Sequence, residues 1–160
     1  KDSFGTARIG GARGACKCSP SCLTRRDREN PRVCSETPDL VIAMTLVDTS
    51  VWIDHLRHGD DKLTELLNEG NVLCHPFVIG ELACGNLRNR VEVLDLLGAL
   101  PSAPTATHNE VLFMIGDRVL SGRGLGWIDV HLLAAALLAN CHLWTHDRSL
   151  EVAATEMHLI

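Results

Sequence analysis

The sequence is poor in the residues on which several common kinds of binding surface depend. It contains no tyrosine and only 4% of its residues are aromatic, which argues against the aromatic platforms on which RRM and OB folds stack bases. No apolar run approaches the roughly 18–20 residues of a membrane-spanning helix. The glycine-rich segment 121–126 lacks the G-x4-G-K-[ST] pattern of a phosphate-binding loop and follows no predicted strand. These features count against a base-stacking sheet, a membrane-spanning helix and a phosphate-binding loop.

Positive charge is also scarce, and it is unevenly distributed. The formal net charge is −5. Residues 1–43 hold eight Lys or Arg and five Asp or Glu, a balance of +3, so residues 44–160 carry −8. Such an acidic body does not bind nucleic acid by bulk charge. It leaves open a site at which bound cations reverse the local sign.

Residues 1–43 differ from the rest of the chain. They are rich in Gly, Arg and Ser and show no periodicity, whereas Met44 directly precedes a strand-like pattern. We interpret 1–43 as a disordered or non-native N-terminal extension and 44–160 as one domain with a real core. A secretory signal is not favoured, because the apolar run 40–47 is short and late.

The seven cysteines divide between the same two parts. Those of the extension, Cys16, Cys18, Cys22 and Cys34, lack the paired C-x2-C spacing and the nearby histidine of a zinc site. The others lie in apolar contexts, which predicts buried free thiols in a reducing cytoplasm; they are Cys74, Cys84 and Cys141.

Within the body, strand-like and helix-like patterns alternate. Strands are predicted at 40–47, 72–75 and 141–145, with a terminal edge strand at 157–160. Helices are predicted at 50–58, 62–69, 76–84, 91–100, 108–120, 127–138 and 149–155. This alternation predicts an α/β fold, in which helices cover both faces of a central, mainly parallel sheet as an α/β/α sandwich.

Two predicted strands end in an acidic residue. The strand 40–47 runs into Asp48, and Thr49 or Ser50 then caps the next helix; the strand 141–145 is followed by Asp147. In open α/β sheets, ligands bind outside the carboxyl ends of the strands. We therefore treat Asp48 and Asp147 as candidate metal ligands or catalytic groups.

Two further acids lie on helix faces that carry apolar residues. Glu81 shares a helix face with Phe77 and Val78. Asp129 shares its face with the apolar residues Leu132, Leu133, Ala136 and Leu137. An acid on an apolar stripe is costly unless it has a partner. We therefore expect both helices to direct these acids inward.

If the four acids converge, their formal charge is near −4. Without a cation, mutual repulsion and desolvation destabilise such a cluster. Hard divalent ions such as Mg²⁺ or Mn²⁺ bind carboxylate oxygens, activate water and clamp a phosphodiester. The hypothesis drawn from the residues is metal-dependent phosphodiester hydrolysis.

Four short motifs in order resemble those of the PIN-domain nucleases, most closely the VapC-type toxins of bacterial toxin–antitoxin pairs. The motifs are Val47-Asp48-Thr49-Ser50, Ile79-Gly80-Glu81-Leu82, Trp127-Ile128-Asp129 and Thr145-x-Asp147-x-x-Leu150. The resemblance covers about 44–160 and implies a small α/β/α sandwich with Mg²⁺- or Mn²⁺-dependent endoribonuclease activity. It implies an acidic quartet, which we define as Asp48, Glu81, Asp129 and Asp147, with hydroxyl positions at Thr49 (or Ser50) and Thr145.

The same resemblance implies partners for the chain. Proteins of this family are usually cytoplasmic homodimers that cleave structured RNA such as tRNA or rRNA, and a cognate antitoxin blocks their active site. An alternative is a catalytically silent PIN fold used for binding or assembly, although the intact quartet counts against it. A D-x-S-x-S metal-adhesion motif is also incomplete, because Trp52 stands at its last serine position.

For several other polar and aromatic residues, the sequence is compatible with either a structural or a functional role. For Asp54, His131 and His146 a solvated or capping role is favoured. The phosphate-contact candidates are Arg88, Arg90, Arg123 and Arg148, for which surface solvation or ion pairing is the default. The three tryptophans, Trp52, Trp127 and Trp144, are expected in the core or a dimer contact.

Overall fold

A three-stranded parallel sheet organises the part of the chain that can be described. The computed structural model describes residues 44–160, and the predictions made for 1–43 lie outside these residues. The strands are β1 (Thr45–Val47), β2 (Val72–Leu73) and β3 (His142–Trp144), in the order β2-β1-β3. Both pairings of β1 are parallel. The predicted parallel sheet is confirmed, and its carboxyl ends meet at one edge.

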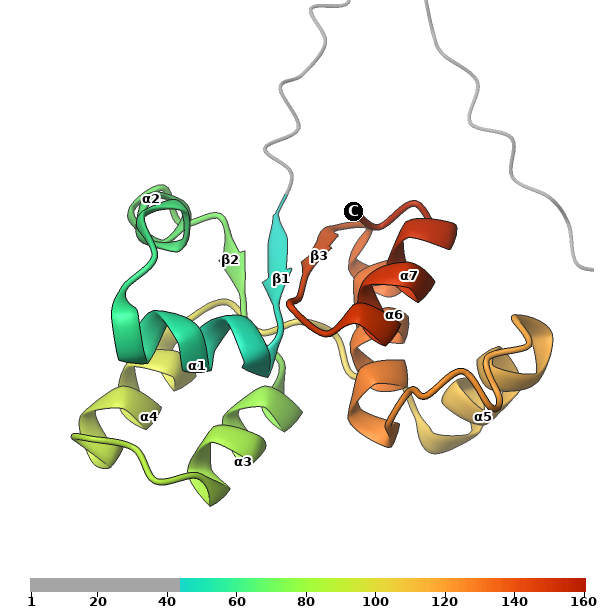
Figure 1. Ribbon diagram of the computed structural model, residues 1–160, viewed down its shortest axis with the longest axis horizontal. Coiled ribbons are helices and arrows are strands. Elements are labelled where there is room, and N and C mark those ends of the chain that lie inside the picture. Colours follow the sequence, from blue (N-terminus) through green and yellow to red (C-terminus); the bar gives the residue numbers. More distant parts are fainter. Residues whose placement is uncertain (1–43) are drawn as a thin grey trace, which may run out of the picture. The chain divides into compact units, whose positions relative to one another are not determined.

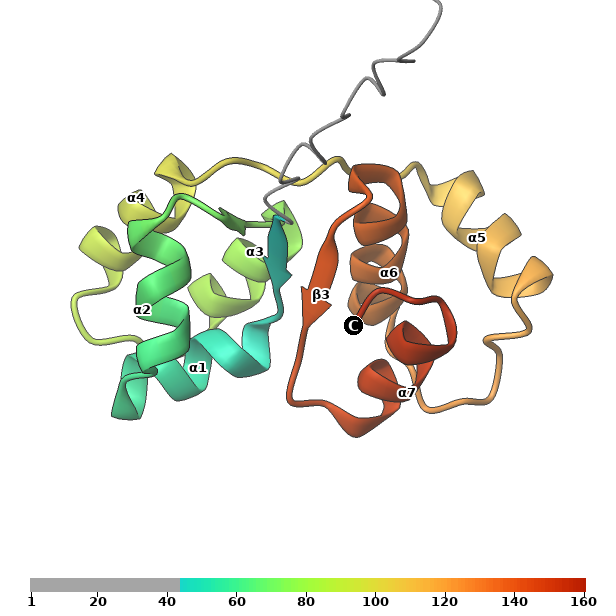
Figure 2. The ribbon, with the colours of Figure 1, turned by 90° about the horizontal axis from the view of Figure 1, so that it is seen from above.

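Seven helices within residues 44–160 lie in two groups with the sheet between them (Figures 1 and 2). Beside β1 and β2 lie α1 (Thr49–His58), α2 (Asp61–Asn68), α3 (Pro76–Cys84) and α4 (Arg90–Ala99). Beside β3 lie α5 (His108–Asp117), α6 (Trp127–Ala139) and α7 (Arg148–Glu156). This arrangement confirms the predicted α/β class. None of the helices described in 44–160 combines the length and hydropathy that a membrane crossing requires.

The core is built around β1 and α6. Leu46 and Val47 of β1 have no exposed surface, and α6 buries every residue from 130 to 136. Three of these are consecutive alanines, whose small side chains allow a helix to pack closely against its neighbours. The helix ends at Asn140, whose positive φ of 48° returns the chain toward β3.

Helix starts are fixed by polar side chains, and one of them differs from the prediction. Asp48 itself caps α1, since its carboxylate accepts from the Ser50 amide at 3.3 Å; the prediction of Thr49 or Ser50 as the cap was wrong. For α2, where the pattern before 62–69 allows either Asp60 or Asp61 as the cap, Asp60 is the cap and accepts from Leu63 N at 2.8 Å. His75, predicted within a strand, instead caps α3 through Nδ1, because the chain leaves the sheet after Leu73.

Two other predictions require correction. Residues 157–160 do not form a strand: His158 adopts a left-handed φ of 57°, and the next residue makes one backbone hydrogen bond to β3, from Leu143 N to Leu159 O. The three cysteines of residues 44–160 were expected to be buried. Cys74 and Cys141 are, but Cys84 is exposed at the end of α3.

Candidate active site

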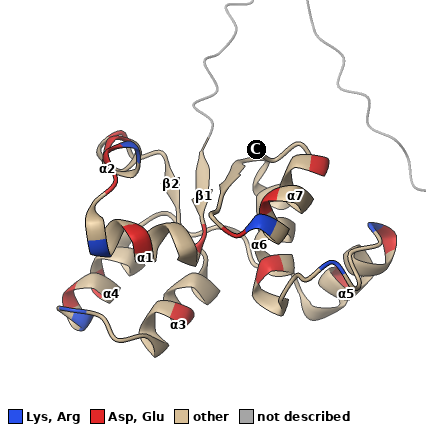
Figure 3. Ribbon diagram, in the orientation of Figure 1, with Lys and Arg blue, Asp and Glu red and all other residues tan. Residues whose placement is uncertain are grey.

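Acidic side chains come together at the carboxyl end of the sheet. Asp48 follows β1 and Asp147 follows β3, where each caps the next helix. Glu81 lies in α3 and Asp129 in the first turn of α6. Figure 3 shows acidic residues at these places: where β1 meets α1, on α3, on α6, and where β3 meets α7. Because β1 and β3 are adjacent and parallel, their two acids emerge at the same edge.

The charges of three quartet acids act on the fourth, Asp129. The pKa of Asp129 is raised above its usual range, first because partial burial desolvates its carboxylate. A hydrogen bond from Gly126 N acts in the opposite direction, and the charges of the other three acids, Asp48, Asp147 and Glu81, raise the pKa further. The fold therefore brings Asp129 within range of repulsion by the other three acids.

Asp48 is the most buried member, with 5% of its surface exposed. Its Oδ2 accepts hydrogen bonds from Ser50 Oγ at 2.6 Å and from Thr145 Oγ1 at 2.9 Å. The same two hydroxyls accept from backbone amides of the β3–α7 connection: His146 N donates to Ser50 Oγ at 3.0 Å and Asp147 N to Thr145 Oγ1 at 2.9 Å. Ser50 and Thr145 thus hold the segment that carries Asp147 against Asp48.

The other three carboxylates are each anchored through one oxygen. The bonds run from Thr49 Oγ1 to Glu81 Oε2 (2.6 Å), from Gly126 N to Asp129 Oδ2 (2.6 Å) and from Leu150 N to Asp147 Oδ1 (2.9 Å). In every member of the quartet, the second oxygen accepts no hydrogen bond from any residue of 44–160. One oxygen fixes the side chain and the other is free for a ligand.

The donor set suits a hard, hydrated cation. All of the candidate ligands are carboxylate oxygens, which Mg²⁺ and Mn²⁺ prefer. Among the residues that the structure describes, no three His, Cys, Asp or Glu side chains are close enough to form a ready-made metal site. Mg²⁺ usually keeps several waters and binds through one or two carboxylates plus substrate phosphates. The residues therefore fit an ion that reaches part of the quartet through water.

Two sequence predictions about side-chain direction fail at this site. Glu81 was expected on the inward face of its helix, but its side chain is exposed, because Val78 and Leu82 are the residues that α3 buries. His131 was expected at the surface, but only 3% of it is exposed. Its ring lies 4.6 Å from that of Phe77 and 4.7 Å from that of Trp127, measured between centroids.

The remaining open residues are placed as follows. Asp54 and His146 are on the surface as expected, and Asp54 pairs with His58. Trp52 is in the core and Trp144 is half-buried, whereas Trp127, expected in the core or a dimer contact, is 42% exposed.

Gly126 is a site residue that the sequence reasoning missed. Its amide holds Asp129, and a Cβ added at Gly126 would lie 3.3 Å from that carboxylate. The signal was present, since a glycine three residues before an acid at a helix start has the spacing of a capping box. Ser50 was considered only as an alternative to Thr49, whereas each hydroxyl holds a different acid.

Thr145→Val is expected to lower the free energy of unfolding by about 1–3 kcal/mol, the usual cost of leaving a buried polar group unsatisfied. Valine matches threonine in shape, but it removes a donor to Asp48 and the acceptor of Asp147 N. Urea unfolding followed by circular dichroism measures the loss. Thr145→Ser, which keeps the hydroxyl, is the matched control and is expected to lose less. Equal stability of the valine variant and the native chain would contradict a structural role for these bonds.

Comparisons with known proteins show the family and the fold of the chain. A family model described as PIN domain matches residues 45–156. The chain is 52% identical over 114 residues to Ribonuclease VapC32 of Mycobacterium tuberculosis, in strain CDC 1551 / Oshkosh and in strain ATCC 25618 / H37Rv. Each match covers 71% of this chain and 92% of the relative. The crystal structure of PAE2754 from Pyrobaculum aerophilum is similar in fold, with a TM-score of 0.53, 17% identity and coverage of 71% of this chain and 86% of that one.

Proposed function

The chain belongs to the PIN domain family and to its VapC type, and we propose that it is a metal-dependent endoribonuclease, a toxin held inactive by a cognate antitoxin. The observation that carries the proposal is the placement of the quartet: the acid after β1, one on α3 and one in the β3–α7 connection lie close enough to a fourth, on α6, for their charges to help raise its pKa. Clustered acids with such effects on one another are typical of functional sites. The ribonuclease name of the relative, at 52% identity, supports RNA as the substrate.

Asp48, Glu81, Asp129 and Asp147 are the residues that would hold Mg²⁺ or Mn²⁺. When bound, the ion supplies a polarised water and offsets the charge of the phosphodiester. The chain's own residues keep the site in position. Thr145 and Ser50 hold the buried carboxylate of Asp48, and Thr49 holds that of Glu81. These hydroxyls are positioning residues, because each acts through an acid.

The resemblance to VapC toxins also supports proposals about partners. We propose that residues 44–160 form the catalytic domain of a cytoplasmic homodimer, that tRNA or rRNA is the substrate, and that the antitoxin covers the quartet. A silent binding or assembly module is the alternative. The intact quartet favours the enzyme, because one oxygen of each of its four carboxylates accepts no hydrogen bond from residues 44–160 and is available to a metal ion.

Cleavage of total RNA tests the proposal. We expect the full chain to produce discrete fragments with Mg²⁺ or Mn²⁺, none with EDTA, and fragments again when excess metal is restored. The ends of the fragments, mapped by sequencing, identify the target RNA. A folded protein that binds Mn²⁺ in calorimetry but cuts no RNA under any of these conditions would favour the silent module instead.

A further inference from the structure

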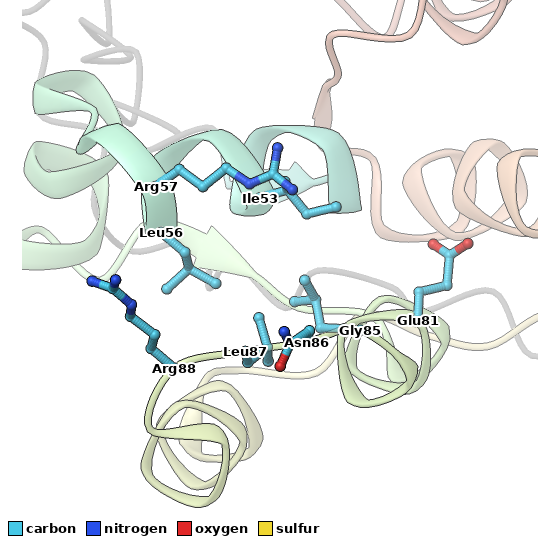
Figure 4. Close-up of a pocket in the computed structure, with 9 residues that line it drawn as sticks. Ile53, Leu56, Arg57, Glu81, Gly85, Asn86, Leu87 and Arg88 are labelled. Carbon is cyan, nitrogen blue, oxygen red and sulfur yellow. The ribbon is translucent and has the colours of Figure 1, made fainter.

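One cavity adjoins the quartet and is lined by positive charge. It has a volume of about 440 Å³ and lies between α1, α3 and the connection from α3 to α4. Figure 4 shows Glu81 at one end, with Arg57 on α1 and Arg88 on the far side of the space, near α4. Between them the lining is largely apolar and includes Ile53, Leu56, Leu82 and Leu87.

The two arginines differ from most other Lys and Arg residues of the domain in having no partner within the described residues. Residues 44–160 hold seven Lys and Arg. Four have a partner in the protein: Arg118 pairs with Asp117, Arg123 pairs with Glu156, Arg90 donates to Ala83 O, and Lys62 lies over the Trp144 ring. The other three, Arg57, Arg88 and Arg148, have no hydrogen bond, ion pair or cation–π contact within the described residues.

Two of these three unpartnered cations thus line a single cavity. The domain around them carries −8, yet neither arginine forms an ion pair within residues 44–160. Cations that are left free in an acidic protein are suited to an anionic group from outside it. The resulting cavity has one negative end, at Glu81, and a positive side, at Arg57 and Arg88.

We propose that this cavity holds the RNA nucleotide next to the scissile bond, with Arg57 and Arg88 binding its flanking phosphates. The proposal rests on the ribonuclease function proposed above. An RNA strand is continuous, so a strand cut at the quartet extends into a space that begins at Glu81. Guanidinium groups bind phosphate oxygens bidentately, and the apolar lining accepts a base or a ribose. The volume of about 440 Å³ lies within the range of about 300–1,000 Å³ typical of ligand pockets.

The arginines and the quartet have different roles in the proposed site. The quartet attracts cations and repels phosphate, so an RNA strand needs positive charge nearby to be held in place. Arg57 and Arg88 supply it from two elements that are far apart in sequence. They act as positioning residues, because they fix the strand and take no part in the reacting bonds.

RNA binding at several salt concentrations tests the assignment. We would measure it by fluorescence anisotropy with Mg²⁺ and a labelled, single-stranded RNA oligonucleotide of mixed sequence. Asp129→Asn serves as background, so that the RNA is not cut. Arg57→Gln and Arg88→Gln are each expected to weaken binding about tenfold, the effect of losing one charge-assisted contact. Each is also expected to reduce the slope of log affinity against log salt by about 0.7.

Arg118→Gln is the matched control. It removes one charge from an exposed arginine that pairs only with its neighbour Asp117, at the end of α5. We expect the control to keep the salt slope and the affinity of the background protein. In the active chain, the Arg57→Gln, Arg88→Gln double variant is expected to cut total RNA slowly at low RNA concentration and to recover most of its rate at saturating RNA.

The outcomes separate this proposal from the one on which it rests. If the native chain cuts RNA while the double variant binds and cuts as the Arg118→Gln control does, the cavity assignment is overturned and the nuclease stands. If RNA binding depends on Arg57 and Arg88 but neither the native chain nor any variant cuts RNA, the nuclease proposal fails; the cavity then binds RNA, but its place beside a scissile bond is overturned. If neither the native chain nor the background protein binds or cuts RNA, both proposals fail, and an acidic protein segment becomes the better occupant.

Discussion

Asp48→Asn is expected to reduce RNA cleavage by about a thousandfold or more while leaving the fold intact. Loss of a group that holds the metal or activates water removes a large share of transition-state stabilisation. Asparagine keeps the size of aspartate and is an equally good helix cap, so α1 still has a start. It also removes a buried charge that repels Asp129. The rate of fragment formation from total RNA, measured with Mn²⁺, reports the loss.

Asp54→Asn is the matched control for this experiment. Asp54 lies on the same helix, α1, but its side chain is exposed and pairs with His58, so its neutralisation is expected to leave cleavage nearly unchanged. Asp129→Asn is expected to behave like Asp48→Asn. Cleavage that survives both quartet substitutions at the native rate would place the reaction elsewhere in the protein.

Acidification is expected to destabilise the protein through His75. This side chain is fully buried, and its Nδ1 accepts from Phe77 N, so Nε2 carries the proton and has no partner. Burial lowers the pKa of His75 to about 4, with a smaller contribution from His131 on α6. The unfolded chain, with a histidine pKa near 6.5, therefore takes up a proton first. Between pH of about 6.5 and 4, the free energy of unfolding should fall by about 3 kcal/mol from this group.

His75→Asn isolates that contribution. Asparagine still accepts a hydrogen bond at the start of α3 but does not titrate, so its stability should depend less steeply on pH in this range. Urea unfolding at a series of pH values measures the difference. His142→Asn, at an exposed position of β3, is expected to keep the native pH dependence. Parallel pH curves for the native chain and His75→Asn would show that His75 is not responsible.

Features that depend on neighbouring residues could be predicted from the sequence. Hydrophobic periodicity predicts the apolar strands before Asp48 and Asp147, and the rule that ligands bind at the carboxyl ends of parallel strands makes these two acids site candidates. The cap at Asp60 follows from the same kind of local pattern. The expected α/β class and the PIN family are confirmed on this basis.

The sequence was insufficient where distant elements decide the environment. His131 is buried because Phe77 of α3 and Trp127 pack on its ring, and periodicity along α6 alone does not show the first of these neighbours. Glu81 is exposed because α3 packs through Val78 and Leu82 instead. Arg57 was not predicted as a site residue, because its proximity to Arg88 depends on how α1 lies against the α3–α4 connection.

The anchored carboxylates have a consequence for ion selectivity. Each acid of the quartet has one oxygen already engaged by a hydroxyl or an amide of the protein. Ca²⁺ accepts bidentate carboxylates in a large, flexible shell, whereas Mg²⁺ takes single oxygens in a near-ideal octahedron. Bidentate ligation here would have to share an oxygen that already accepts a hydrogen bond from Thr145, Thr49, Gly126 or Leu150. For the proposed ion, the anchoring therefore favours monodentate binding through the free oxygen, and with it Mg²⁺ over Ca²⁺.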